Sequence, residues 1–151
     1  MIQSAGVIVV DYSNKLEPRA LCVRAYSSWD FPKGKVEGEE SLHAAAVREL
    51  CEETSISLPD DATWDLSIDD GHINVMSAPP ITYGKGSRAK TVTYFLASRT
   101  SKKEPSLPIN ESLGRPENDE WRWVEVSKLE QLMPLRLAPV VAYLKTQVAQ
   151  S

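Results

Sequence analysis

Three glutamates crowd one short stretch of the chain, at Glu49, Glu52 and Glu53. Residues three and four apart are neighbours on a helix surface, so within a helix these carboxylates project from one side. Like charges at this spacing repel one another, and a helix gains no stability from them. A divalent cation removes the repulsion, because magnesium is bound by one or two carboxylates together with the phosphates of a substrate. The cluster therefore predicts a site for a metal ion and a phosphate.

A helix over 40–54 is expected to present these carboxylates. With the first glutamate as the reference direction and 3.6 residues per turn, Ala44, Val47 and Cys51 fall on the opposite side, with Leu50 on the flank. These apolar side chains form a stripe that can pack on a sheet. We therefore expect one face to hold the helix down while the other offers the carboxylates.

The rest of the chain alternates between strand and helix patterns. Strands are predicted over 4–11, 19–26, 63–76, 91–98 and 121–126, with a loop over 27–38, a surface excursion over 99–118, and helices over 128–133 and 138–148. Asp69-Asp70-Gly71 interrupts the third strand with a hairpin signal. This alternation predicts an α/β sandwich with a mixed sheet.

The composition is that of a soluble globular protein, with 151 residues of which 42% are hydrophobic and 25% charged. The length fits a single domain over 1–151. The net charge of -4 argues against general binding to DNA, and no apolar run is long enough to cross a membrane. No secretory signal is recognisable. A cytoplasmic location is expected, with Cys22 and Cys51 as buried free thiols.

The segment 34–56 resembles the Nudix box, whose pattern is G-x5-E-x7-R-E-U-x-E-E-x-G-U, where U is apolar. The matching residues are Gly34, Glu40, Arg48, Glu49, Leu50, Glu52, Glu53 and Ile56. Ser55 departs from the pattern, because the family has glycine just past the helix, where a left-handed backbone is common. Serine there is expected to cost about 1 kcal/mol. The resemblance implies a Nudix-type α/β/α sandwich with a mixed central sheet.

Segments on both sides of the box resemble the diadenosine tetraphosphate hydrolases of this family. They are 29–36 (WDFPKGKV) and 90–97 (KTVTYFLA). Glu117 followed by Arg122-Trp123 is similar to a late acidic residue and strand of those enzymes. The diphosphoinositol polyphosphate phosphohydrolases share much of the same pattern.

The resemblance implies Mg²⁺ as the cofactor, with Mn²⁺ as a substitute. Glu49, Glu52 and Glu53 would bind the metal, and the backbone carbonyl of Gly34 or Lys35 would add a ligand. The alternative for the three glutamates is a solvated helix face. A bound metal would bridge phosphate oxygens and lower the pKa of a bound water.

Glu52, Glu53, Arg48 and Glu117 are the predicted catalytic residues. Arg48 would orient the acidic cluster from outside the ligand set, and a plain ion pair with Glu52 is the alternative. Glu117 would act as the general base or as an extra ligand, and the alternative is a loop carboxylate without such a role. By the resemblance Glu40 would be a further metal-site or orienting residue, and the alternative is a charge favoured by the helix dipole.

Basic and aromatic side chains near the box are candidates for binding the substrate. The cations are Lys33, Lys35, Lys85, Arg88 and Lys90, which as a set could offset the charges of a polyphosphate. Ordinary surface cations are the alternative. Tyr94 and Trp29 could stack on a base, and core packing is the alternative for Tyr94.

These features together predict a magnesium-dependent hydrolase that cleaves a phosphoanhydride in a dinucleoside polyphosphate, with diadenosine tetraphosphate giving ATP and AMP. The alternatives within the same class are diphosphoinositol polyphosphates and RNA 5'-ends, and the acidic total weighs against long RNA. A Nudix-fold module that binds a nucleotide without cleaving it is the non-enzymatic alternative. The presence of all three glutamates argues against that module. A small-molecule substrate is expected for a monomer or homodimer, with no DNA or membrane partner.

Overall fold

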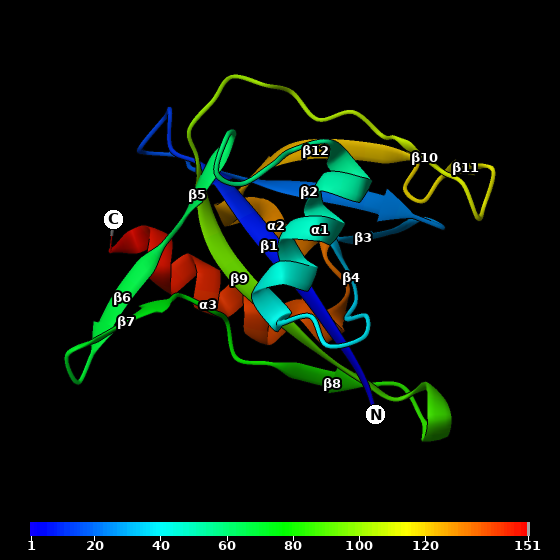
Figure 1. The fold of residues 1–151 in the computed structure, drawn as a ribbon. Coiled ribbons are helices and arrows are strands. Elements are labelled where there is room, and N and C mark those ends of the chain that lie inside the picture. The colour runs from blue at the N-terminus through cyan, green and yellow to red at the C-terminus, as the bar shows by residue number, and fades with distance from the viewer. Residues whose placement is uncertain (151) are drawn as a thin grey trace.

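The computed structural model describes residues 1–150 of the chain (Figure 1). The strands are β1 Ile2–Asp11, β2 Arg19–Ala25, β3 Ser28–Asp30, β4 Lys33–Lys35, β5 Ala62–Trp64, β6 Leu66–Asp69, β7 His72–Val75, β8 Ile81–Tyr83, β9 Lys90–Arg99, β10 Ile109–Asn110, β11 Arg115–Pro116 and β12 Glu120–Glu125. The α-helices are α1 Leu42–Thr54, α2 Leu129–Leu132 and α3 Ala138–Ala149, and the 3₁₀ turns are η1 Gly86–Arg88, η2 Val126–Lys128 and η3 Leu135–Leu137.

The main sheet has eight strands and is mixed. Its central order is β12-β2-β1-β9-β5, with β3 paired to β2, β4 to β1 and β8 to β9. The parallel pair is β1 with β9, in a register that places Val7 opposite Phe95. The other pairs in this sheet are antiparallel. Two small hairpins, β6-β7 and β10-β11, stand apart from it.

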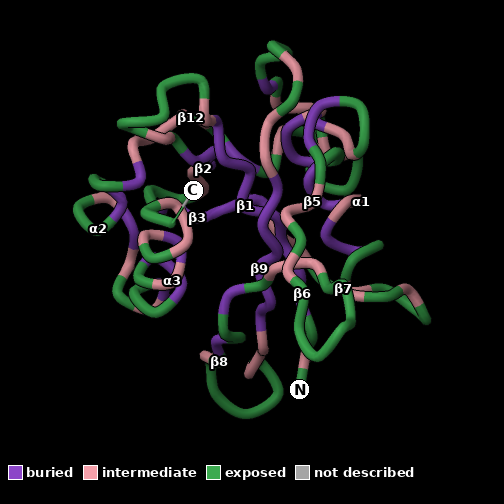
Figure 2. Tube along the Cα trace, turned by 90° about the vertical axis from the view of Figure 1, so that its left-hand side faces the viewer, coloured by how far each residue is buried: buried purple, intermediate pink, exposed green. Residues whose placement is uncertain are grey.

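Helices cover both faces of this sheet, and Figure 2 shows α1 and α3 on opposite sides of β1 and β9. The apolar run in β1 explains the arrangement, because successive side chains of a strand point to opposite faces. Val7 and Val9 join the core under α1, whereas Ile8 and Val10 join the core under α3. A strand buried on both faces needs such a continuous apolar run. The predicted α/β/α sandwich with a mixed sheet is confirmed.

Helix α1 is held down by a different face from the one expected. Its buried residues are Ala45, Ala46, Glu49, Leu50, Glu53 and Thr54. Ala44 and Cys51 are exposed and Val47 is half-buried, so the stripe predicted from them is wrong. Helical periodicity placed the charged side chains on the solvent side, but the tertiary structure buries two of the glutamates against neighbouring strands. The expectation that both cysteines are buried is likewise wrong, since Cys22 alone is.

Local sequence accounts for both ends of α1. The side chain of Ser41 caps the first turn by accepting a hydrogen bond from the backbone N–H of Ala44 at 3.1 Å. Ser55 ends the helix in the left-handed region, with φ 66°, and its N–H donates to the carbonyl of Cys51 at 2.9 Å. The family's glycine position therefore keeps its left-handed backbone although serine occupies it.

The loop expected over 27–38 contains two short strands, β3 and β4, which position much of the site. Three-residue strands are too short to show alternation in sequence, and pairing with β2 and β1 fixes them. The surface excursion over 99–118 contains the β10-β11 hairpin and ends at the buried Asn118. The hairpin predicted at Asp69-Asp70-Gly71 is confirmed as β6-β7. In the part of the chain described here, no helix has the length and hydropathy needed to span a membrane.

Candidate active site

Helix α1 and the segment before β12 bring three carboxylates together. Glu49, Glu53 and Glu117 each offer an oxygen, and these oxygens lie within 4.8 Å of one another. Glu49 and Glu53 are buried, with 8% and 7% of their surface exposed, whereas Glu117 is exposed. Glu117 is far from α1 in sequence, so the tertiary fold completes the cluster.

Strand β4 passes directly over the first of these carboxylates. A Cβ atom added to Gly34 would lie 2.0 Å from Cδ of Glu49 and 2.2 and 2.3 Å from its two oxygens. Real Cβ atoms do not approach other atoms so closely, so any larger residue here would force the carboxylate of Glu49 to move. The first glycine of the box therefore allows the backbone of β4 to lie in close contact with a candidate metal ligand. Its carbonyl stays a predicted ligand.

Arg48 ties the cluster to the segment that precedes α1. Its guanidinium donates to Glu49 Oε1 at 2.8 Å, to Glu40 Oε1 at 2.6 Å and to the carbonyl of Lys35 at 2.9 Å. It also donates to Glu52 Oε2 at 3.1 Å. This network reaches well beyond a single surface ion pair, and it fixes the orientation of Glu49. The carbonyl of Lys35 is already engaged by this hydrogen bond, which competes with its predicted role as a metal ligand.

The protonation behaviour of the cluster reflects burial among like charges. Burial and the nearby carboxylate of Glu117 raise the pKa of Glu53 well above its ordinary value. Burial also raises the pKa of Glu49, against the opposing effect of Arg48. Asn118 donates to Glu53 Oε1 at 2.8 Å, and Glu53 Oε2 is buried with no hydrogen-bond partner among the described residues.

An unpartnered buried carboxylate oxygen beside two further carboxylates fits a hard divalent cation. Such an ion would neutralise the charges that otherwise repel, and it would supply Lewis acidity toward a phosphoryl oxygen. Glu49, Glu53 and Glu117 are the residues placed to hold it.

Glu52 does not join this cluster in the structure. Its side chain is 58% exposed and pairs with Arg48 across one helical turn. The expectation that all three glutamates of α1 share one solvent-facing side is wrong, because Glu49 and Glu53 turn toward the sheet while Glu52 does not. Its role as a metal ligand and catalytic residue stays a prediction.

A cavity of about 270 Å³ opens beside the carboxylates. Among its lining residues are Glu53 and Glu117 and two cations, Lys33 and Arg136, together with Asp30. It thus combines acidic groups for a metal with basic groups for phosphate. Of the five cations predicted from the sequence, Lys33 lines this cavity.

The other predicted cations lie outside the cavity. Lys35, Lys85 and Arg88 are exposed, and Lys90 has its ammonium 5.2 Å from the ring of Tyr83. The guanidinium of Arg136 lies 5.0 Å from the same ring. Direct contact with a substrate stays a prediction for these four cations.

The two aromatic candidates have structural partners. Tyr94 is fully buried and donates its hydroxyl proton to Asp30 Oδ1 at 2.7 Å, so it packs in the core and offers no ring face to a base. Trp29 is 8% exposed, with the guanidinium groups of Arg24 and Arg122 at 5.8 and 4.9 Å from its ring. Base stacking on Tyr94 is therefore corrected to core packing, and stacking on Trp29 would require displacing an arginine.

Sequence reasoning missed Asp30, Asn118 and Arg136 as residues of the site. Asp30 lies in the segment 29–36 that resembles the hydrolases, and Asn118 lies in the expected surface excursion over 99–118. The spacing of neither residue indicates a role in a site. Arg136 lies 106 residues from its partner Asp30, in a 3₁₀ turn before α3, and no motif marks it. Only the folded chain brings these side chains to the carboxylates.

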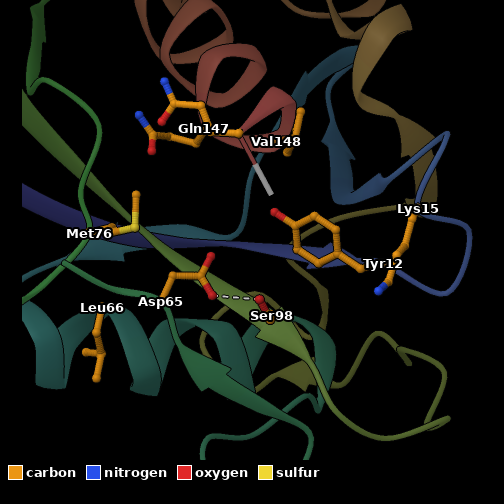
Figure 3. Close-up of a pocket in the computed structure, with 9 residues that line it drawn as sticks. Tyr12, Lys15, Asp65, Leu66, Met76, Ser98, Gln147 and Val148 are labelled. Atoms are coloured by element: carbon orange, nitrogen blue, oxygen red, sulfur yellow. Dashed lines mark hydrogen bonds between the residues drawn. The ribbon is translucent and has the colours of Figure 1, made fainter.

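A larger hollow of about 600 Å³ lies elsewhere, between the β6-β7 hairpin and the end of α3 (Figure 3). Asp65 and Ser98 lie within it, joined by a hydrogen bond of 2.6 Å. It shares no lining residue with the cavity beside Glu53. Its size alone does not make it the site, because the carboxylate cluster and the cations that could hold a metal and phosphate gather at the smaller cavity.

Known proteins match both the sequence and the fold. The chain matches the family model of the NUDIX domain over residues 2–144. RNA pyrophosphohydrolases of Dinoroseobacter shibae and Acidiphilium cryptum are each 31% identical, over 87% of this chain and over 81% and 75% of those proteins. A solved structure of an Ap4A hydrolase of C. elegans, in a binary complex, has a TM-score of 0.77 over 100% of both chains at 20% identity.

The chain therefore belongs to the Nudix family. It is a pyrophosphohydrolase of that family, which confirms the assignment made from the box. The likeness to the Ap4A hydrolase, at 20% identity, concerns the fold.

Proposed function

We propose that the protein hydrolyses a phosphoanhydride of a dinucleoside polyphosphate in a magnesium-dependent reaction, with diadenosine tetraphosphate giving ATP and AMP. The observation that carries this proposal is the unpartnered buried oxygen of Glu53 beside Glu49 and Glu117, next to a cavity that also presents Lys33 and Arg136. Phosphoryl transfer needs little besides positioning and charge stabilisation, and these groups supply both.

Each residue of the site has a distinct task in this proposal. Glu49 and Glu53 hold the cation, and Arg48 fixes the orientation of Glu49. Glu117 is exposed beside the cluster, so it can complete the ligand set or take a proton from the attacking water. Lys33 and Arg136 offset the charge of the substrate phosphates. Mg²⁺ suits the all-oxygen site, and Mn²⁺ is a substitute of similar preference.

RNA 5'-ends are the second candidate substrate. The RNA pyrophosphohydrolases that are 31% identical to this chain favour it. Against it stand the net charge of -4 and the exposed carboxylate of Glu117 at the cavity, since a long RNA is bound chiefly through its phosphate backbone.

A substrate panel tests the proposal. Diadenosine tetraphosphate, ATP, a diphosphoinositol polyphosphate and a 5'-triphosphorylated RNA are each incubated with the protein in Mg²⁺, in Mn²⁺ and in EDTA, and the products are resolved by chromatography. We expect ATP and AMP from the first substrate, with the highest kcat/KM of the panel and no turnover in EDTA. Preferential release of pyrophosphate from the RNA would transfer the assignment to RNA ends.

The variant Glu53→Gln tests the carboxylate site itself. The amide keeps the shape and loses the charge, so we expect turnover to fall roughly 100-fold or more while the fold persists. Glu130→Gln is the matched control, because Glu130 pairs with Lys145 on the surface and lines neither cavity. Wild-type turnover in Glu53→Gln would remove the metal assignment.

A further inference from the structure

Asp30 lines the cavity beside Glu53, and its two carboxylate oxygens have different partners. Oδ1 accepts hydrogen bonds from the backbone N–H of Phe31 and from the hydroxyl of Tyr94, both at 2.7 Å. Oδ2 faces two cations, with Nη2 of Arg136 at 3.2 Å and Nζ of Lys33 at 3.8 Å. One oxygen is thus tied to the core of the protein, and the other to the basic groups of the cavity.

The anchor on the Oδ1 side is rigid. Tyr94 is fully buried in the middle of β9, and its ring packs edge-to-face against that of Phe31 at 5.7 Å. Asp30 itself is 9% exposed. Because the core fixes both donors, the carboxylate cannot rotate without breaking a buried hydrogen bond, which is costly. Oδ2 therefore keeps a constant direction.

The two cations need such an anchor more than most side chains do. Lysine and arginine have long, flexible side chains whose ordering costs entropy when a ligand binds. Lys33 and Arg136 come from β4 and η3, and their side chains are 22% and 33% exposed. Arg136 is further held against the ring of Tyr83 at 5.0 Å. Both cations are thus ordered before any substrate arrives.

We propose that Asp30 is a positioning residue for the hydrolysis, which rests on the function proposed above: it holds Lys33 and Arg136 together so that both bind phosphate groups of the polyphosphate substrate. Asp30 does not touch the substrate, since its negative charge repels phosphate. Asp30 favours substrate binding by orienting the two cations, and this favourable contribution must exceed the electrostatic repulsion between its carboxylate and phosphate. The two effects have opposite signs, so their balance can be measured.

The variant Asp30→Asn separates orientation from charge. The amide oxygen must remain at Oδ1 to accept from Phe31 and Tyr94, so the amide nitrogen replaces Oδ2 and presents N–H groups to the two cations. If charge alone mattered, a polyanion would bind more tightly to this variant. Because Lys33 and Arg136 lose their common acceptor, we expect tripolyphosphate to bind roughly tenfold more weakly.

Two measurements record this effect. Isothermal titration with sodium tripolyphosphate in EDTA reports binding without metal or turnover. Steady-state kinetics with diadenosine tetraphosphate and Mg²⁺ should show KM rising by the same factor while kcat changes little.

Asp30→Glu restores a charged acceptor and should recover part of the loss of binding. Arg19→Gln is the control for cation removal, because Arg19 is exposed and lines neither cavity.

A double-mutant cycle shows whether Asp30 acts through Arg136. Arg136→Gln alone should weaken tripolyphosphate binding, and in the Asp30→Asn background it should have little further effect. Additive losses would overturn the proposal, as would tighter or unchanged binding in Asp30→Asn.

The fold of each variant is checked by its thermal unfolding, since Asp30 is buried. If Asp30→Asn does not fold, Tyr94→Phe removes one anchor of Oδ1 and Arg136→Gln removes a cation. Wild-type binding in both variants would then overturn the proposal. Because titration in EDTA needs no turnover, a failure of the proposed substrate leaves this result readable: tripolyphosphate binding would still depend on Asp30 even if diadenosine tetraphosphate were not cleaved.

Discussion

Among the single residues of the site, Gly34 is constrained by the side chain that packs against it. The space that a Cβ would need is taken by the carboxylate of Glu49. A substitution here acts on a candidate metal ligand and not on the backbone of β4, because the φ of Gly34 is not among the positive values of the chain. The glycine that opens the Nudix box is therefore a steric requirement of the site.

Gly34→Ala should displace Glu49 and impair metal binding with a moderate loss of stability. The overlap at 2.0 Å cannot be relieved without moving either β4 or the carboxylate, and overpacking of this kind typically costs about 1–3 kcal/mol. We expect the Mg²⁺ concentration for half-maximal activity to rise, as measured by titrating Mg²⁺ in a turnover assay.

Gly38→Ala is a suitable comparison for that experiment, since nothing lies within 4 Å of a Cβ added at Gly38. Its left-handed φ of 53° gives it a backbone cost of its own. It should lose stability without a change in the Mg²⁺ requirement. An unchanged Mg²⁺ requirement in Gly34→Ala would contradict the steric explanation.

At the scale of elements, α1 is an unusual amphipathic helix because its buried side includes two carboxylates. Glu49 and Glu53 lie among the same buried positions as Ala46 and Leu50. Burying charge is costly unless it is compensated, and Arg48 and Asn118 compensate only part of it. The remaining cost is the reason to expect a cation at this helix.

The N-cap of α1 should contribute measurably to the free energy of unfolding and should have little effect on catalytic turnover. Ser41→Ala removes the acceptor for the N–H of Ala44, so we expect the free energy of unfolding to fall by about 1 kcal/mol. Urea denaturation followed by circular dichroism measures this difference. Ser127→Ala, at an exposed position in η2, is the control and should change stability little. An equal loss in both variants would argue against the cap.

At the scale of the whole molecule, the site joins segments that are distant in sequence. The carboxylates come from α1 and from the segment before β12, and the cations come from β4 and η3. A ligand that binds these parts together binds the folded state alone, so it stabilises the whole protein.

Mg²⁺ should therefore raise the melting temperature of the wild-type protein. At a concentration about 100 times its Kd, binding contributes roughly 2.7 kcal/mol, which corresponds to several degrees for a chain of this size, at about 2–4 °C per kcal/mol. Differential scanning calorimetry with Mg²⁺ and with EDTA measures the shift. In Glu49→Gln the shift should shrink or vanish, and a full shift there would place the cation elsewhere.

The sequence predicted the fold class because its signals are periodic and local. The apolar run of β1, the amphipathic strands around it and the spacing of the box each specify an element, and the matching family confirms the assembly. The short strands β3 and β4 could not be predicted, since their pairing with β2 and β1 defines them. Helical periodicity also could not predict which face of α1 is buried. The charge of its glutamates predicted exposure to solvent, but two of them are buried in the site.

The sequence predicted the family from the spacing of the box, the sandwich from the alternation of strand and helix patterns, and a metal site at Glu49, Glu52 and Glu53 from their positions on one helix. Folding places Glu117, which the family resemblance had predicted as a base or an extra ligand, beside Glu49 and Glu53. Only the tertiary structure reveals that Glu52 turns away and that Asp30 and Arg136 share the cavity with Lys33. The physical reason is that a site for a charged substrate is assembled from side chains whose proximity depends on long-range packing. Spacing along the chain does not indicate such contacts.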